Sequence, residues 1–346
     1  MINGWCMSRH RHSFRIALAA ALLCVVAPAT AQVGHMFAAW APQCVPSLGN
    51  LTAWNASTDL PAARYRHASS VLLDGRVFIG GGFNSGAAHQ ATTWLGTVSG
   101  TTISWDASTA LPATRSNVAA SVLPDGRILI PGGFNGSYQT TVWLGTVSGT
   151  TISWTTSTAL PAVRALTTVN ILPDGRALII AGSNGSTIAT TLLGTVSGTT
   201  ISWVTSNALP AARALHTASI LLDGRVLVTG GWDGSFATQA NTWLGTVSGT
   251  TISWAASTAL PAARYAHTAS VLSDGRILVT GGFNGSAQTT TWLGTVSGTT
   301  ISWAASTALP AGRNSHSASV LPGGQVLLTA GEVMATTLLS SWSGGC

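Results

Sequence analysis

The chain has 346 residues, of which 46% are hydrophobic and only 7% are charged. It contains no lysine and a single glutamate, Glu332, and its formal net charge is +6. Three arginines lie within the first fifteen residues, so the remainder carries 12 arginines against 9 acidic residues, a net charge of +3. Because these arginines are spread out and do not cluster with aromatic residues, the composition argues against nucleic acid as a partner.

Residues 1–31 have the pattern of a secretory signal peptide. Arginines precede an apolar run at 16–28, and Ala29-Thr30-Ala31 supplies small residues for cleavage. The run is shorter than a membrane-spanning helix needs, and no later stretch is long and apolar enough to span. Cys24 follows two leucines, whereas a lipoprotein signal has a small residue there. We therefore expect an exported protein, secreted or periplasmic, with no membrane span.

Residues 32–50 form a linker that carries Cys44. Removal of the signal peptide takes away Cys6 and Cys24 and leaves Cys44 and Cys346. An exported chain with two cysteines near its ends is expected to join them in one disulfide.

An eleven-residue string, LGTVSGTTISW, occurs five times without change. The copies end at Trp105, Trp154, Trp203, Trp254 and Trp303, and a degenerate copy ends at Trp54. The spacing of these tryptophans is 49 or 51 residues. A period of this length indicates a repeat architecture, in which each unit buries its apolar face against its neighbours.

Each repeat contains four short extended segments. In the copy ending at Trp254 they cover 215–222, 225–229, 242–247 and 251–254, and Asp223-Gly224 and Ser248-Gly249 supply two of the turns. Four antiparallel strands joined by short hairpins are typical of one blade of a β-propeller. The alternative is a parallel β-solenoid, whose coils are usually shorter and need fewer hairpins.

Counting strands gives the number of blades. The chain opens with a lone fourth-type strand at 51–54, continues through five complete repeats, and ends with three strands near Trp342. We therefore predict an all-β domain at 51–346, a six-bladed propeller whose N-terminal strand completes the last blade and closes the ring. This pairing would place Cys44 and Cys346 at the same junction, where a disulfide would lock the ring.

The repeat resembles the kelch repeat. The resemblance rests on LPAAR, a histidine three residues later, DGR, a branched run, a double glycine such as Gly230-Gly231, and a distal tryptophan. It covers nearly all of the chain after the signal peptide. The DGR form is similar to bacterial kelch proteins and to the propeller of galactose oxidase.

The repeats differ from one another mainly on one predicted face of the disk. DGR and VSGTT hardly change, whereas the residues after LPAxR and the loops after the glycine pair vary. These are the loops after the second and fourth strands, and they share one face, which peptide-binding kelch proteins generally use. The alternative is drift in solvent-exposed loops. The candidate binding residues, chosen because aromatics and arginine dominate binding hot spots, are Tyr65, Arg66, Phe83, Phe134, Tyr138, Trp232, Phe236, Tyr265, Phe283 and Glu332.

Two sets of polar residues recur at fixed positions and are interpreted as structural. The arginines of the six LPAxR segments form a ring, and each could bond carbonyls of a neighbouring blade. We prefer this structural interpretation to the alternative, an anion-binding ring. The six arginines are Arg64, Arg115, Arg164, Arg213, Arg264 and Arg313. His67, His216, His267 and His316 share one register on the innermost strand, with Val118 and Thr167 in the other two repeats. Lacking nearby carboxylates or cysteines, they are expected to pack rather than bind metal, and no cofactor is expected.

The preferred function is a monomeric binding scaffold for a protein, peptide or glycan. The resemblance also implies two enzyme alternatives. A copper radical site like that of galactose oxidase would need tyrosine ligands and a cysteine crosslinked to a tyrosine. This chain has only three tyrosines, and Cys44 and Cys346 lie outside the complete blades. A sugar epimerase or mutarotase would need a general acid or base, and only Asp233 and Glu332 lie on the variable face. A third alternative is a recently expanded array with no selected ligand.

Overall fold

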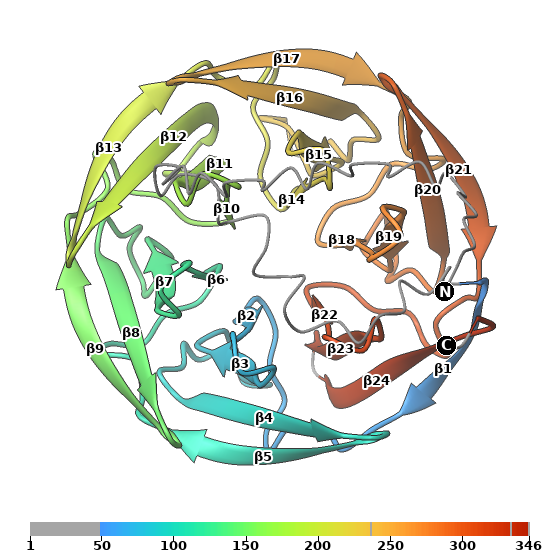
Figure 1. Cartoon of the computed structure of the whole chain (residues 1–346), viewed down its shortest axis with the longest axis horizontal. Helices are drawn as coiled ribbons and strands as arrows, with labels where there is room; N and C mark the ends of the chain where they lie inside the picture. Colours follow the sequence, from blue (N-terminus) through green and yellow to red (C-terminus); the bar gives the residue numbers. More distant parts are fainter. Residues whose placement is uncertain (1–48, 236, 333, 345–346) are drawn as a thin grey trace, which may run out of the picture.

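The computed structural model describes residues 49–344 apart from positions 236 and 333. Within these ranges it contains 24 strands and no helix. The strands form six sheets of four, which stand around a central axis as the blades of a disk (Figure 1). The prediction of an all-β, six-bladed propeller with four-stranded antiparallel blades is confirmed. The predicted signal peptide at 1–31, Cys44, Cys346 and Phe236 lie outside the described residues.

We number the blades in chain order, so that blade 6 combines the last three strands with the first. Blade 1 contains β2 (Ala68–Val71), β3 (Val77–Gly80), β4 (Thr93–Ser99) and β5 (Thr102–Ser108). Blade 2 contains β6 (Ser121–Val122), β7 (Ile128–Pro131), β8 (Val142–Ser148) and β9 (Thr151–Ser157). Blade 3 contains β10 (Thr168–Ile171), β11 (Ala177–Ser183), β12 (Thr187–Ser197) and β13 (Thr200–Ser206). Blade 4 contains β14 (Thr217–Ile220), β15 (Val226–Thr229), β16 (Thr242–Ser248) and β17 (Thr251–Ser257). Blade 5 contains β18 (Thr268–Val271), β19 (Ile277–Thr280), β20 (Thr291–Ser297) and β21 (Thr300–Ser306). Blade 6 contains β22 (Ser317–Val320), β23 (Val326–Gly331), β24 (Met334–Trp342) and β1 (Leu51–Ala56).

The hydrophobic core lies between blades rather than inside them. The second strand of a blade, such as β15, is a short apolar run that is buried throughout, because neighbouring blades cover both of its faces. Leu227 and Leu244 of blade 4, for example, belong to one cluster with Val279 and Trp292 of blade 5. Six such clusters each join two neighbouring blades within the described residues. A blade therefore depends on both neighbours for its stability.

The repeated string LGTVSGTTISW bonds each blade to the preceding one at the rim. In blade 4, Gly245 pairs with Trp254 across β16 and β17, and a Cβ on Gly245 would lie 2.6 Å from the indole Cζ3 atom. Glycine thus leaves room for the indole, which donates its N–H to the Asn207 carbonyl of blade 3 at 3.2 Å. Equivalent indole bonds are made by Trp54, Trp105, Trp154, Trp203 and Trp303.

The second constant motif, DGR, bonds neighbouring blades on the face that carries the hairpin turns, here called the turn face. Arg225 donates from Nε to Asp223 at 2.8 Å and from Nη1 to the Gly298 carbonyl of blade 5 at 2.6 Å. Gly298 lies in the Ser-Gly turn between β20 and β21. The two motifs that hardly vary among the repeats therefore contact each other across a blade boundary.

Blade 6 lacks the DGR pair and offers a test of its contribution. Gly323 and Gln325 stand where the other blades have aspartate and arginine, and a cavity of about 320 Å³ separates this turn from Gly100 of blade 1. We expect the double change Gly323→Asp with Gln325→Arg to raise the free energy of unfolding by about 0.5 to 1 kcal/mol, the usual size for a surface ion pair. Urea unfolding measures it, with each single change as control. A double variant no more stable than the better single variant would contradict the expectation.

The first and last described strands meet in blade 6. β1 pairs antiparallel with β24, with Trp54 opposite Ser340. Beyond the strands, the Ser343 N–H donates to the Asn50 carbonyl at 2.9 Å, and the Asn50 N–H donates to the Ser343 hydroxyl at 2.8 Å. The disulfide between Cys44 and Cys346 stays a prediction, since both cysteines lie outside the described residues.

Candidate functional site

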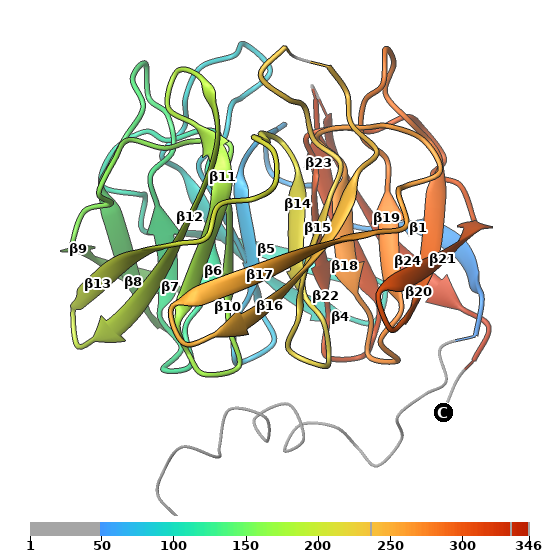
Figure 2. The same cartoon turned by 90° about the horizontal axis from the view of Figure 1, so that it is seen from above.

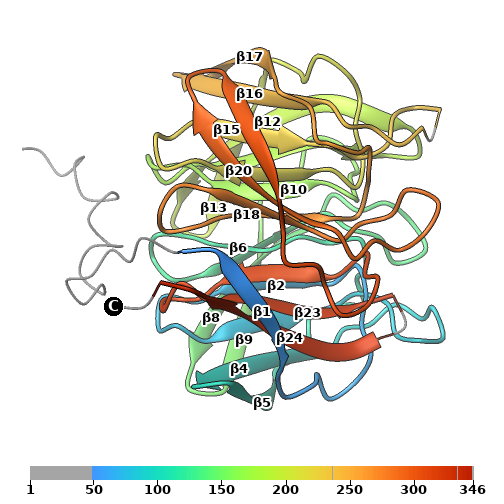
Figure 3. The ribbon, with the colours of Figure 1, turned by 90° about the vertical axis from the view of Figure 1, so that its right-hand side faces the viewer.

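The loops after the second and fourth strands of each blade form one face of the disk, here called the loop face. They stand above the strands in Figure 2 and to the right in Figure 3, opposite the hairpin turns. All the candidate binding residues that the structure describes lie on these loops, between strands rather than within them. The loop face is therefore where the varying residues of different repeats can meet.

Pairs of glycines bring the two variable loops of a blade together. In blade 1, Gly81 and Gly82 have φ values of +66° and +87°, and a Cβ on Gly82 would lie 2.8 Å from the Tyr65 carbonyl oxygen. This close approach lets Phe83 and Tyr65 exchange backbone hydrogen bonds of 2.9 and 3.1 Å. The same bridge joins Ser116 to Phe134, Ala165 to Ser183, Ala214 to Trp232, and Tyr265 to Phe283. In blades 1 to 5 the residue after the ring arginine is thus held beside the residue after the glycine pair, whose first member is replaced by Ala181 in blade 3.

These bridges assemble a continuous row of rings across blades 1 and 2, here called the first aromatic arc. Tyr65 stacks on Phe83 with ring centroids 5.0 Å apart, and Phe83 lies 4.8 Å from the ring of His89. His89 contacts Phe134 at 5.5 Å, and Phe134 contacts Tyr138 at 5.1 Å. His89, which is absent from the candidates chosen by sequence, is the ring that bridges the two blades. Among the loops that follow the glycine pairs, only this one contains a histidine, and this difference was the signal in the sequence that could have identified His89.

A second aromatic arc spans blades 4 and 5. The ring of Trp232 lies 5.1 Å from Tyr265, and Tyr265 lies 5.4 Å from Phe283. Every ring of both arcs is half-buried. Blade 3 places Ala165 and Ser183 at the equivalent positions, and blade 6 places polar residues there. With six blades in the ring, the two arcs face each other across the central axis and are separated by polar blades 3 and 6.

One residue from each blade lies near the central axis on the loop face, and these six residues are here called the collar. Each collar residue follows the ring arginine by two positions and has a left-handed backbone with φ between +50° and +55°. The collar consists of Arg66, Asn117, Leu166, Leu215, Ala266 and Ser315. Left-handed conformations cost non-glycine residues about 1 kcal/mol each, so the surrounding structure must hold them. Except for Arg66, they are absent from the candidates chosen by sequence, because only Asn117 among them is of a residue type that favours a positive φ.

Backbone hydrogen bonds link the collar from blade to blade. The Ala266 N–H donates to the Leu215 carbonyl at 2.9 Å, and the Ser315 N–H donates to the Ala266 carbonyl at 2.9 Å. The Arg66 N–H donates to the Ser315 carbonyl at 3.0 Å, which continues the collar across the boundary between blades 6 and 1. The collar therefore has a fixed backbone frame. Its side chains differ from blade to blade, except that blades 3 and 4 both have leucine.

Two charged residues, Arg66 and Glu332, lie near the centre of the loop face. Arg66 Nη1 donates to Asn117 Oδ1 at 3.4 Å, while Glu332 is exposed and accepts a 2.9 Å bond from the Asn314 amide. Burial lowers the pKa of Arg66 below its usual value, and the negative charge of Glu332 partly opposes this. Through its bond to Asn117, the guanidinium of Arg66 reaches from the loop before blade 1 to the collar residue of blade 2.

The six ring arginines are buried and are engaged within the blade that each one precedes. Arg313, for example, donates from Nη1 to the Ala330 carbonyl at 2.7 Å and from Nη2 to the Thr336 hydroxyl at 2.7 Å. In blades 1, 2, 4 and 5 the guanidinium also lies over a tryptophan, as Arg64 does over Trp94 at 4.5 Å. The repeat pattern had suggested side-chain bonds to a neighbouring blade. The side chain instead bonds its own blade, and the arginine backbone bonds the neighbour, as Arg115 N–H does to the Gln90 carbonyl at 2.8 Å.

The four register histidines are also buried and bond hydroxyl groups of the preceding blade. His267 Nε2 lies 2.9 Å from the Thr229 hydroxyl of blade 4, and His67 Nε2 lies 2.9 Å from the Ser317 hydroxyl of blade 6. Burial, reinforced by the charge of Arg64, lowers the pKa of His67 to about 3. The same causes, with Arg213 and Arg164 as the charges, lower the pKa of His216 to about 3. These side chains are therefore neutral at pH 7.

Among the described residues, no three His, Cys, Asp or Glu side chains gather in a way that could hold a metal ion. Within the same part of the chain, no helix has the length and apolar character needed to cross a membrane.

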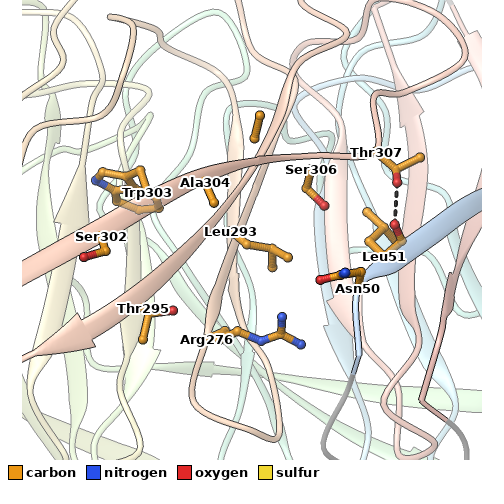
Figure 4. Close-up of a pocket in the computed structure, with 11 residues that line it drawn as sticks. Asn50, Leu51, Arg276, Leu293, Thr295, Ser302, Trp303, Ala304, Ser306 and Thr307 are labelled. Carbon is orange, nitrogen blue, oxygen red and sulfur yellow. Dashed lines mark hydrogen bonds between the residues drawn. The ribbon is translucent and has the colours of Figure 1, made fainter.

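A cavity of about 480 Å³ lies beside β1 at the rim of the disk, away from the centre of the loop face. It is lined by Arg276, Trp303 and Thr307 among others (Figure 4). The Thr307 hydroxyl donates to the Leu51 carbonyl beside it. None of the candidate binding residues lines this cavity.

Comparison with known proteins supports the fold and goes no further. No protein-family model matches the chain, and no curated protein is similar enough in sequence to count as a match. A solved structure titled "Structure of YjhT" is similar with a TM-score of 0.63 and 15% sequence identity. The match covers 82% of this chain and 95% of that one. At this identity the likeness shows a shared propeller architecture, and the kelch resemblance stays a prediction.

Proposed function

We propose that the protein is an exported binding module that holds a peptide or glycan on its loop face. The observation that carries this proposal is the pair of aromatic arcs on opposite sides of the central axis. Half-buried rings expose apolar surface, and rings such as Tyr65 and Trp232 add a polar group at one end, a combination typical of binding surfaces. The rigid disk supports them, so little ordering is required when a ligand binds.

A binding role accounts for the loop-face carboxylates better than catalysis does. Asp233 Oδ1 accepts hydrogen bonds from the backbone N–H groups of Ser235 and Ala237 at 2.8 and 3.1 Å. Its Oδ2 accepts a 2.8 Å bond from Gln239. Asp233 thus shapes its own loop, which does not favour Asp233 and Glu332 as the acid and base of an epimerase reaction.

Binding by the arcs can be tested with changes that copy residues already present in other blades. Phe134→Ser copies Ser183 of blade 3, and Tyr265→Ala copies Ala214 of blade 4, so both substitutions suit the local backbone. We expect each to weaken binding of a ligand found on glycan or peptide arrays by about 10- to 30-fold, the effect of losing an aromatic hot spot. Isothermal titration measures the change.

The matched control for these variants lies on the turn face. Leu222 is 70% exposed, and Leu222→Ser copies Ser273 of blade 5. This change removes exposed apolar surface without touching the loop face, so binding should stay the same. Equal losses in the control and in the arc variants would refute the loop face as the binding surface.

A further inference from the structure

Arg66 stands apart from the other arginines of the described chain. Five of the twelve follow aspartate in DGR turns and form ion pairs of 2.6 to 2.7 Å. Six form the buried ring and bond carbonyl or side-chain oxygens of their own blades. Arg66 alone belongs to neither motif, and it lies in the collar between the two aromatic arcs.

The guanidinium of Arg66 has few acceptors in the described structure. Its Nη1 makes a long hydrogen bond of 3.4 Å to Asn117 Oδ1, and its Nε is buried without a hydrogen-bond partner, as is the Nε of every ring arginine. All ion pairs within 4 Å among the described residues are those of the DGR turns, so Glu332 makes none with Arg66. A guanidinium carries five N–H donors, and a partly buried cation without a bonded anion is costly. The collar therefore holds a cation whose terminal nitrogens can donate hydrogen bonds to an anionic ligand.

The charges around Arg66 select the kind of anion. Arg66 is the one arginine among the six collar residues, and its single positive charge is matched by a monoanion better than by a phosphate dianion. A carboxylate carries one negative charge and matches the planar guanidinium in shape. Tyr65 directly precedes Arg66 in the chain and stacks on Phe83 in the first aromatic arc, so its ring can contact the apolar part of a ligand.

We propose that Arg66 binds a carboxylate group of the ligand at the centre of the loop face, an inference that rests on the proposed binding function. The carboxylate lies against the terminal guanidinium nitrogens, and the body of the ligand extends over one or both aromatic arcs. Arg66 thereby supplies charge selectivity, while the arcs supply contact area. The carboxylate can come from an acidic peptide side chain or from an acidic sugar.

The equivalent collar residues of blades 3 and 4 provide the variant that tests this site. Leu166 and Leu215 have the same left-handed φ as Arg66, at +55° and +51°, so Arg66→Leu is compatible with the backbone. Arg66→Lys keeps the charge but removes the planar fork. The control for lost charge is Arg76→Gln on the turn face, which copies Gln325 of blade 6.

The experiment compares ligands that differ only in the carboxylate. One arm titrates a glutamate-containing peptide and its glutamine counterpart, and the other titrates an oligosaccharide of uronic acid and its neutral counterpart. We expect one acidic ligand to bind more tightly than its neutral counterpart, and Arg66→Leu to weaken it by about 10- to 100-fold, as for a lost charge-assisted hydrogen bond. The Arg76→Gln control should bind like the unaltered protein, and Arg66→Lys should fall between the two.

Glu332 provides an effect in the opposite direction. Glu332→Gln removes a nearby negative charge and keeps an oxygen to accept the Asn314 amide, so it should tighten carboxylate binding by a few-fold at low salt. Equal affinity for acidic and neutral ligands, or an unchanged affinity in Arg66→Leu, would overturn the carboxylate site. Binding that survives Arg66→Leu but is lost in Phe134→Ser would leave the proposed function standing, whereas binding unaffected by either change would refute both.

Discussion

Stability of the propeller is expected to fall steeply between pH 6.5 and pH 4. Four buried histidines bond hydroxyl groups across blade boundaries, and burial lowers the pKa of each, with neighbouring arginines adding to the effect. In the unfolded chain their pKa returns to about 6.5. Because the folded pKa is the lower one, the unfolded state takes up the proton first, and stability present above pH 6.5 is lost as the pH falls toward 3.

The size of this acid effect follows from proton linkage. Each proton taken up on unfolding changes the free energy of unfolding by about 1.4 kcal/mol per pH unit. Four histidines together give a limiting slope of roughly 5 kcal/mol per pH unit, which few domains withstand over two units. The DGR aspartates act in a lower window. Burial raises the pKa of Asp74, but the bonds and charge of Arg76 outweigh it and lower the pKa, so this contribution is lost only below about pH 4.

Two blades have another residue in place of the register histidine, and these residues supply the controls. His216→Thr copies Thr167, and His267→Val copies Val118, each at the same register in another blade. Urea unfolding at several pH values, followed by tryptophan fluorescence, should show the slope between pH 6 and 5 reduced by about one proton in each variant. A slope that is the same in the variants and in the unaltered protein would show that these histidines are not the cause.

Gly245→Ala is expected to destabilise the protein by about 2 to 3 kcal/mol, although it adds only one methyl group. The added Cβ would lie 2.6 Å from Trp254 Cζ3 and 2.9 Å from Ile252 Cγ2. Trp254 would have to move, which would stretch or break its 3.2 Å indole bond to the Asn207 carbonyl of blade 3. The change therefore weakens both the blade and its contact with the preceding one.

The control for this prediction is a glycine with free space. A Cβ added to Gly323 would have no atom within 4 Å, and the φ of this glycine is not positive. Gly323→Ala should therefore leave the free energy of unfolding within about 0.5 kcal/mol of its original value. Denaturant unfolding of both variants measures the difference. If the two substitutions had equal effects, the close contact between Gly245 and Trp254 would not be limiting stability.

The sequence predicted the architecture because the same strand and turn signals recur in every repeat. It could not predict the partners of Arg313, since both its own blade and the next one lie within reach of such a side chain. The aromatic candidates Tyr65 and Phe134 were found by residue type, but His89, which joins them, was missed because its role depends on contact across a blade boundary. Collar residues such as Asn117 were missed for a similar reason. Their backbone takes part in hydrogen bonds between blades, such as the 3.1 Å bond from the Leu166 N–H to the Asn117 carbonyl.

The indole bonds and the DGR contacts also affect how this fold can change over generations. Both hold the ring together from the rim and the turn face, away from the loops that differ among repeats. A substitution on the loop face can therefore alter recognition while these contacts stay in place. Duplicating a repeat copies the joints together with the strands, and each copied loop can then diverge independently. Such a scaffold separates the residues under selection for folding from those free to acquire a new specificity.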